Sequence, residues 1–209
     1  MKIFFLILFL SAGSLFPQQS TLSKNVNSIS EYLASKEFNN LNCSDLEKMD
    51  YIYENALRIC GDDETETLLA LTFACVPYNR VHLRVPLLNA ILVFPLISAS
   101  DSIFLMKNKS LPRRLFIDSP TNDYGDMDKP AHFFGSAFVA HSESIFDFAF
   151  VIGYFVEAFE ESFEVQNQVD YRDIRTNQLG AFFGRQLKCN SKLKPSQVLS
   201  LYSLNLILL

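Results

Sequence analysis

The sequence predicts a mainly α-helical protein, a single helical bundle whose C-terminal half holds a polar seam shared by three helices. Apolar residues recur at helical spacing in several segments, whereas Val, Ile and Thr rarely alternate with polar residues, so little strand is expected. The chain has 209 residues, of which 49% are hydrophobic. That is enough for one domain with a sizeable core.

The net charge of the chain argues against broad binding of nucleic acids or anionic lipids. The formal net charge is −5 and no basic run occurs. Proteins that bind nucleic acids or anionic lipids broadly carry excess Lys and Arg. We therefore expect no nucleic-acid partner, and the composition identifies neither a protein partner nor a substrate.

Residues 1–14 have the pattern of a secretory signal peptide. Lys2 precedes an apolar block over residues 3–10, and Ala12 and Ser14 stand at the small-residue positions that signal peptidase prefers. The alternative, an uncleaved membrane anchor, needs about 20 apolar residues. No cysteine lies near the cleavage region, so we expect no lipid anchor there. The sequence thus predicts an exported protein, periplasmic or associated with the cell envelope.

Export would place the four cysteines in a compartment that oxidises thiols. They are Cys43, Cys60, Cys75 and Cys189. Four cysteines allow three pairings, and their spacing favours neither one pairing nor disulfides over free buried thiols. No CxxC pair occurs, so a zinc knuckle is not expected.

The region of residues 15–120 is expected to be largely helical. Residues 15–42 are polar, which predicts a loose lead-in with one short helix over residues 30–38. Ser44 and Glu47 then have the spacing of a capping box. The apolar residues that follow recur at helical spacing, so an amphipathic helix is expected to begin here.

Glycine and proline predict the next boundaries. Gly61 is expected to end the amphipathic helix, and a second helix with an acidic first turn follows over residues 62–75 until Pro77. Residues 81–106 are the most hydrophobic internal stretch. Prolines divide this stretch into pieces too short to span a bilayer, so we expect buried core rather than insertion into a membrane surface. Residues 107–124 are expected to form a connecting loop.

The helix expected after this loop belongs to the second main region, residues 121–188. Asp128, Lys129 and His132 stand at its head, before an apolar run. Asp126 or Asp128 can cap it, and a proline in the first turn costs no hydrogen bond. The simplest interpretation of a lone histidine here is a hydrogen-bonded core residue.

Two further helices are expected to carry polar faces. Ser136 and Glu143 share the side of His132, four and eleven residues further on. The next helix is apolar until Glu157, where four glutamates begin to recur at i, i+3, i+4 and i+7. Four unpaired anions cannot all be buried, so most must face water. Glu157, one turn after Gly153, is the one expected to face inward.

The third helix has the sharpest pattern. Asp173, Asn177, Gly180 and Gly184 fall at i, i+4, i+7 and i+11, on a single face. Each glycine costs a helix about 1 kcal/mol relative to alanine. The two glycines make sense if the backbone of another helix packs against them, as pairs of small residues permit.

The three polar faces together predict the seam. Its candidate polar cluster is Asp128, Lys129, His132, Glu157, Asp173 and Asn177, and its helix-packing residues are Gly153, Gly180 and Gly184. Buried polar groups need partners, so we expect the cluster to converge. His132, Glu157 and Asp173 are also candidate metal ligands, for which Mg²⁺ or Mn²⁺ suits better than Zn²⁺. No catalytic residue is assigned, and no cofactor beyond such a divalent metal is suggested.

These motifs also resemble a known family. Asp128-Lys129-x-x-His132-Phe133, the glutamate at 157 and Asp173-x-x-x-Asn177-x-x-Gly180-x-x-x-Gly184 are similar to the pattern of VanZ-like proteins, and closer still to the YfiM-like family of exported lipoproteins. The resemblance covers residues of about 123–188. VanZ-like proteins are small helical membrane proteins, some associated with glycopeptide resistance, so the resemblance implies a helical fold and an envelope location. Here the signal peptide lacks the lipobox cysteine, and residues 14–120 have no counterpart.

Three functions stay open at this point. The first is a non-enzymatic envelope protein whose buried polar network holds the bundle together, since no GxSxG, HExxH or P-loop signature occurs. The second is a metal-dependent or acid–base hydrolase of the envelope, with Lys129 stabilising a developing anion. The third is a membrane-embedded VanZ-like bundle, which the many Phe residues favour and Asp147 opposes. The tail, residues 189–209, is expected to contain a short docking helix.

Overall fold

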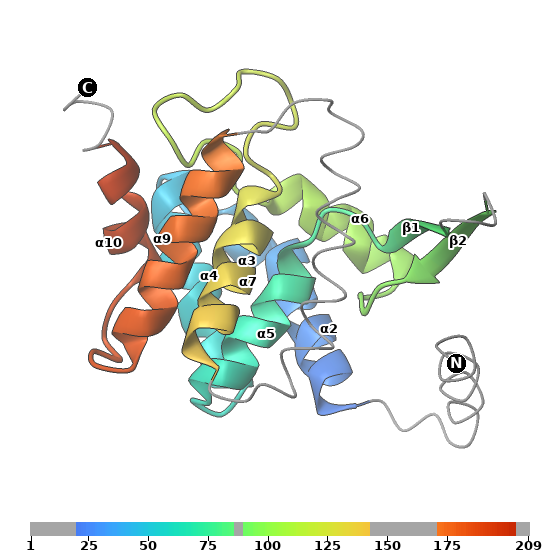
Figure 1. The fold of residues 1–209 in the computed structure, drawn as a ribbon, viewed down its shortest axis with the longest axis horizontal. Coiled ribbons are helices and arrows are strands. Elements are labelled where there is room, and N and C mark those ends of the chain that lie inside the picture. Colours follow the sequence, from blue (N-terminus) through green and yellow to red (C-terminus); the bar gives the residue numbers. More distant parts are fainter. Residues whose placement is uncertain (1–19, 86–89, 143–170, 204–209) are drawn as a thin grey trace.

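The structure is a computed structural model that describes residues 20–85, 90–142 and 171–203; for residues 81–85, 90–92 and 94 it describes the backbone alone. The described part is mainly helical, and its helices pack against one another as a bundle (Figure 1). The predicted fold class is therefore confirmed. Within the described ranges, no helix combines the length and the apolar character needed to cross a membrane.

The N-terminal part is more ordered than the sequence suggested. Helices α2 (Thr21–Ala34) and α3 (Lys36–Asn39) replace the expected loose lead-in and single short helix. Ser20 caps α2 through its side chain, which accepts a hydrogen bond from the backbone N–H of Ser23. The prediction failed because the apolar residues of this segment are few and lie among Ser and Asn, although several of them share one face of α2. The fully buried ones are Val26, Ile29 and Leu33.

Helices α4 (Asp45–Ile59) and α5 (Glu64–Cys75) agree with the predicted pair. The capping box is present, because the Ser44 side chain accepts from the backbone N–H of Glu47 and the Glu47 carboxylate accepts from the backbone N–H of Ser44. Gly61 follows α4 with φ of +68°, the left-handed conformation that glycine adopts at least cost. Local sequence signals therefore suffice for this helical hairpin.

The hydrophobic stretch 81–106 does not form one buried core segment. It contains most of an antiparallel hairpin of β1 (Arg80–Val85) and β2 (Ala90–Pro95), followed by α6 (Asp101–Ser110). The hairpin extends away from the helices (Figure 1), and Val93 is 50% exposed. Arg and His alternate with Val and Leu through β1, which is the period of a strand. The expected loop accordingly begins only after α6.

The end of α6 covers the C-terminal end of α5. Lys107 is buried, and its Nζ donates to the carbonyl oxygen of Val76 at 2.7 Å and to Oδ1 of Asn108 at 2.7 Å. Asn108 Nδ2 donates to the carbonyl oxygen of Pro77 at 2.9 Å. The two side chains thus satisfy carbonyls that follow a helix end and have no partner within the helix. Burial lowers the pKa of Lys107 to about 8.

Titration of Lys107 is expected to make stability depend on pH. Its pKa is about 8 in the folded protein against an ordinary 10.5, so the unfolded state binds more protons between these values. The free energy of unfolding therefore rises with pH through that window, by about 1 kcal/mol between pH 7 and pH 9. Urea unfolding of the native protein and of Lys107→Met at both pH values measures this gain, which the variant is expected to lose.

Stability is compared only up to pH 9 because a second group, Cys75, titrates above that pH. Burial raises the pKa of the Cys75 thiol from an ordinary 9.0 to about 12. Above pH 9 the unfolded chain therefore loses this proton first, and stability falls with pH. An equal rise from pH 7 to pH 9 in Lys107→Met and in the native protein would show that another group causes it.

Helices α7 (Lys129–His141), α9 (Tyr171–Leu187) and α10 (Pro195–Leu199) build the part of the bundle that carries the cluster. In Figure 1, α7 lies between α5 and α9, and it packs against both. The tail contains the expected docking helix, because α10 packs on α4 and α9. Asp50 anchors α10 by accepting from the backbone N–H of Ser196 at 2.8 Å and from its Oγ at 2.6 Å.

The two glycines of α9 lie directly on the backbone of α7. A methyl group on Gly180 would overlap the carbonyl oxygen of Phe133, and one on Gly184 would overlap the carbonyl oxygen of Ala137. The close helix contact expected from the glycine spacing is thus present, and α7 is the helix that makes it. The helix expected to carry Gly153 and Glu157 lies outside the described residues.

Candidate functional site

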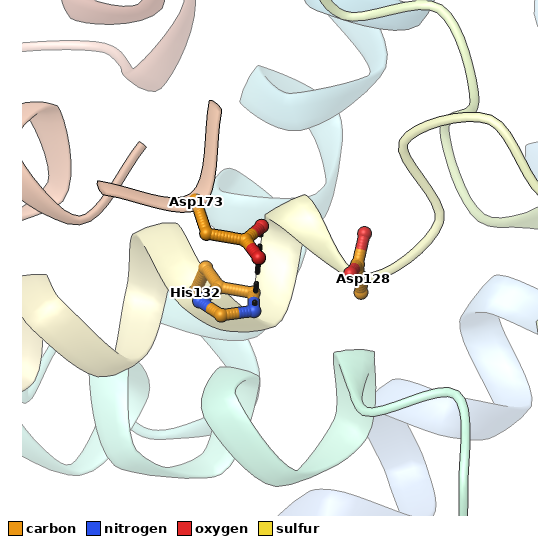
Figure 2. A group of neighbouring side chains, drawn as sticks. All are labelled: Asp128, His132 and Asp173. Atoms are coloured by element: carbon orange, nitrogen blue, oxygen red, sulfur yellow. Dashed lines mark ion pairs between the residues drawn. The ribbon is translucent and has the colours of Figure 1, made fainter. Parts of the chain in front are cut away.

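The polar cluster lies where the first turns of α7 and α9 meet. Asp128 is the N-cap residue of α7, and Lys129 and His132 follow in its first turns. Asp173 and Asn177 lie one turn apart on α9. The structure therefore brings together all the predicted polar residues that it describes. Figure 2 shows the Asp173 carboxylate beside the His132 ring, with Asp128 at the start of α7.

Burial makes this cluster energetically demanding. The exposed fractions are 9% for Asp128, 2% for Lys129, 3% for His132 and 7% for Asp173. A buried carboxylate without a partner costs several kcal/mol, and here two lie within reach of one another. Each needs a positive charge or hydrogen-bond donors close by.

Lys129 supplies positive charge to both carboxylates. Its Nζ lies 2.5 Å from Oδ1 of Asp173 and 3.1 Å from Oδ1 of Asp128. The lysine belongs to α7 and Asp173 to α9, so one of these ion pairs joins the two helices. With a neutral His132, the two carboxylates and one ammonium leave a local formal charge of −1.

His132 makes the second connection between the helices. Its Nδ1 lies 3.2 Å from Oδ1 of Asn177, and Ser136 Oγ donates to the same oxygen at 3.1 Å. An amide oxygen only accepts, so this geometry assigns the imidazole proton to Nδ1. Nε2 lies 3.7 Å from Oδ1 of Asp173, the pair marked by the dashed line in Figure 2.

The protonation of His132 follows from its burial. Desolvation lowers the pKa of the imidazole below its ordinary value, although the carboxylates of Asp173 and Asp128 raise it. Desolvation is the larger effect, so the neutral ring dominates at pH 7.

A second histidine of α7, which the sequence analysis did not single out, also contacts α9. His141 Nδ1 lies 3.0 Å from the carbonyl oxygen of Gly184, and its Nε2 lies 3.5 Å from Oε2 of Glu64 at the start of α5. A basic residue in the last turn of a predicted helix was the available signal, since such residues complement the helix end. The two histidines connect α7 to α9 near both ends of α7.

Asp126, one of the two expected caps, has a different role. Its side chain is fully buried, and Oδ1 pairs with a guanidinium nitrogen of Arg172 at 2.7 Å. Oδ2 accepts from the backbone N–H of Leu115 at 3.0 Å and from Ser119 Oγ. Asp126 thus ties the loop before α7 to the start of α9. Asp128 occupies the N-cap position, without a capping hydrogen bond from its side chain.

Two chemical roles fit the geometry. The cluster is a buried ionic network between two helices, and it is also a set of potential metal ligands. Asp128, His132 and Asp173 each offer one ligand atom, and these atoms lie within 4.8 Å of one another. The sequence analysis had placed Glu157 in this set instead of Asp128, and Glu157 lies outside the described residues. The four cysteines are free thiols in the structure.

The fold and the cluster define a class: a helical bundle in which two helices in direct backbone contact share a buried ionic cluster. Comparison of the chain with protein families, curated proteins and solved structures found no match. The resemblance to YfiM-like and VanZ-like proteins therefore stays a prediction.

Proposed function

We propose that the protein is an exported, non-enzymatic protein of the cell envelope in which the polar cluster holds α7 against α9. The observation that carries this proposal is the buried Lys129 ammonium, which pairs with both Asp128 and Asp173 at the helix contact. Export is supported by the signal-peptide pattern of residues 1–14.

The cluster is suited to specify one register between the helices. Lys129 pairs with Asp173, while His132 and Ser136 share Oδ1 of Asn177 as their partner on α9. If α9 slid along α7, these pairs would separate, and the charged groups would stay buried among apolar side chains without partners. Networks of this kind can select a single packing arrangement because partly satisfied alternatives cost more.

Alanine substitutions test the structural role. Asp173→Ala is expected to lower the free energy of unfolding by about 3 kcal/mol, because it removes the buried ion pair between Lys129 of α7 and Asp173 of α9. His132→Ala is expected to cost about 2 kcal/mol through lost packing and the lost hydrogen bond to Asn177 Oδ1. Urea unfolding of purified protein measures both, with Asp123→Ala as the control because Asp123 is exposed. Unchanged stability in both cluster variants would contradict the proposal.

Cell fractionation distinguishes the proposed envelope protein from the membrane-embedded alternative. After fractionation of cells that export the native chain, the protein is expected in the aqueous phase of a detergent phase separation. Recovery in the detergent phase would favour the membrane-embedded bundle instead.

A further inference from the structure

His132 and Asp173 offer ligand atoms that lie close enough together for one cation. The Nδ1 proton is directed at Asn177, so Nε2 presents its lone pair, and the nearest Asp173 oxygen lies 3.7 Å away. The Lys129 ammonium, 2.5 Å from the same Asp173 oxygen, already provides the positive charge beside these two acceptors. The 3.7 Å separation of the two acceptors also fits two ligand atoms that each lie about 2.1 Å from one metal ion.

Asp128 completes a set of three ligands. Its carboxylate comes from the N-cap position of α7, and all three ligand atoms lie within 4.8 Å of one another. One imidazole and two carboxylates form a hard-to-borderline set, which suits Mn²⁺ better than soft, thiolate-seeking ions. The three residues come from two helices whose spacing the glycine contacts hold.

The surroundings of His132 match those of a metal-bound histidine. Such a histidine almost always donates its second ring N–H to an acceptor, which fixes the tautomer and the ring orientation. Asn177 Oδ1 is that acceptor here, and Ser136 Oγ, 3.1 Å away, donates to the same amide oxygen. This observation does not depend on the two carboxylates, because it concerns only the Nδ1 side of the ring and its hydrogen-bond partner Asn177.

We infer that Asp128, His132 and Asp173 form a divalent-cation site in which Mn²⁺ takes over from the Lys129 ammonium as partner of the two carboxylates. Both carboxylates now face that ammonium, so cation entry requires Nζ to move away from them. Two carboxylates and one Mn²⁺ are neutral together, whereas the same two carboxylates with the ammonium carry a formal charge of −1. The inference rests on the cluster of the proposed function, whereas the structural role of that cluster does not depend on a cation.

Titration with Mn²⁺ tests this site. The full chain is freed of metal with chelator, Mn²⁺ is added, and the free ion is measured by its electron paramagnetic resonance signal. We expect one Mn²⁺ per native chain and a rise in the melting temperature. Asp173→Asn and His132→Gln are expected to weaken binding at least tenfold, whereas Lys129→Met is expected to strengthen it because the competing ammonium is gone. His141→Gln, the other histidine of α7, is the matched control and is expected to bind like the native chain.

A spectroscopic measurement on the native chain avoids any dependence on variants that fold poorly. Bound Mn²⁺ is expected to show electron spin-echo coupling to a single imidazole nitrogen, and that coupling should vanish in His132→Gln. The proposed site would be contradicted if Mn²⁺ did not bind the native chain or bound only Lys129→Met. It would also be contradicted if His132→Gln bound Mn²⁺ as tightly as the native chain. Loss of stability in metal-free His132→Ala and Asp173→Ala would still support the structural role, so the two failures are distinguishable.

Discussion

Gly180→Ala is expected to lower the free energy of unfolding by about 3 kcal/mol or more. The new Cβ would overlap the carbonyl oxygen of Phe133, which is backbone and cannot rotate away. Relief requires α9 to move off α7, and that movement would also separate Lys129 from Asp173. Urea unfolding followed by circular dichroism measures the loss, and Gly184→Ala is expected to behave alike.

Helix propensity makes this prediction unusually clear in sign. At an unhindered helix position, exchange of glycine for alanine stabilises by about 1 kcal/mol. A stabilised Gly180→Ala protein would therefore show that α9 does not pack on α7 as described. Gln178→Ala is the control within the same helix, because Gln178 is exposed and its replacement is expected to change stability by under about 0.5 kcal/mol.

Lys129→Met is expected to cost about 3–5 kcal/mol in metal-free protein, since it leaves two buried carboxylates without their shared cation. Methionine keeps much of the volume of the lysine side chain, so the loss reports the charge more than the packing. The expected result is a lower midpoint in urea with an unchanged slope, because the folded state keeps its buried surface.

A second substitution is expected to recover part of that loss. Asp173→Asn removes one of the two uncompensated charges, so Lys129→Met/Asp173→Asn should be more stable than Lys129→Met alone. Such coupling between neighbours is what a double-mutant cycle measures. If the two substitutions instead destabilise additively, Lys129 and Asp173 do not interact across the helix contact, and the cluster does not hold α7 to α9.

The helices that the sequence predicts best are those with strong local signals. The capping box at Ser44 and Glu47 and the glycine after α4 mark both ends of that helix without help from the rest of the fold. The start of α2 was missed because its apolar residues are few and lie among Ser and Asn. Their complete burial depends on the helices that α2 packs against, which no local pattern shows.

The hairpin of β1 and β2 was missed for a different reason. A short apolar run divided by prolines suits a buried segment as well as a strand, and periodicity alone does not decide between them. The pairing of Arg80 with Pro95 and of Val85 with Ala90 settles the register, and pairing is a property of two segments. The alternation of basic and apolar residues in β1 was the signal that could have revealed it.

For the candidate site, the spacing of polar residues and glycines was enough to predict which faces of α7 and α9 carry the polar cluster and the close helix contact. Spacing along one helix follows from its geometry, so Asp173, Asn177, Gly180 and Gly184 share a face in any α-helical structure. The partners on the other helix do not follow from spacing. Only the packing of α9 on α7 brings Lys129 between two carboxylates and sets His132 against Asn177, because contacts between residues 44 or 45 positions apart depend on how whole helices dock.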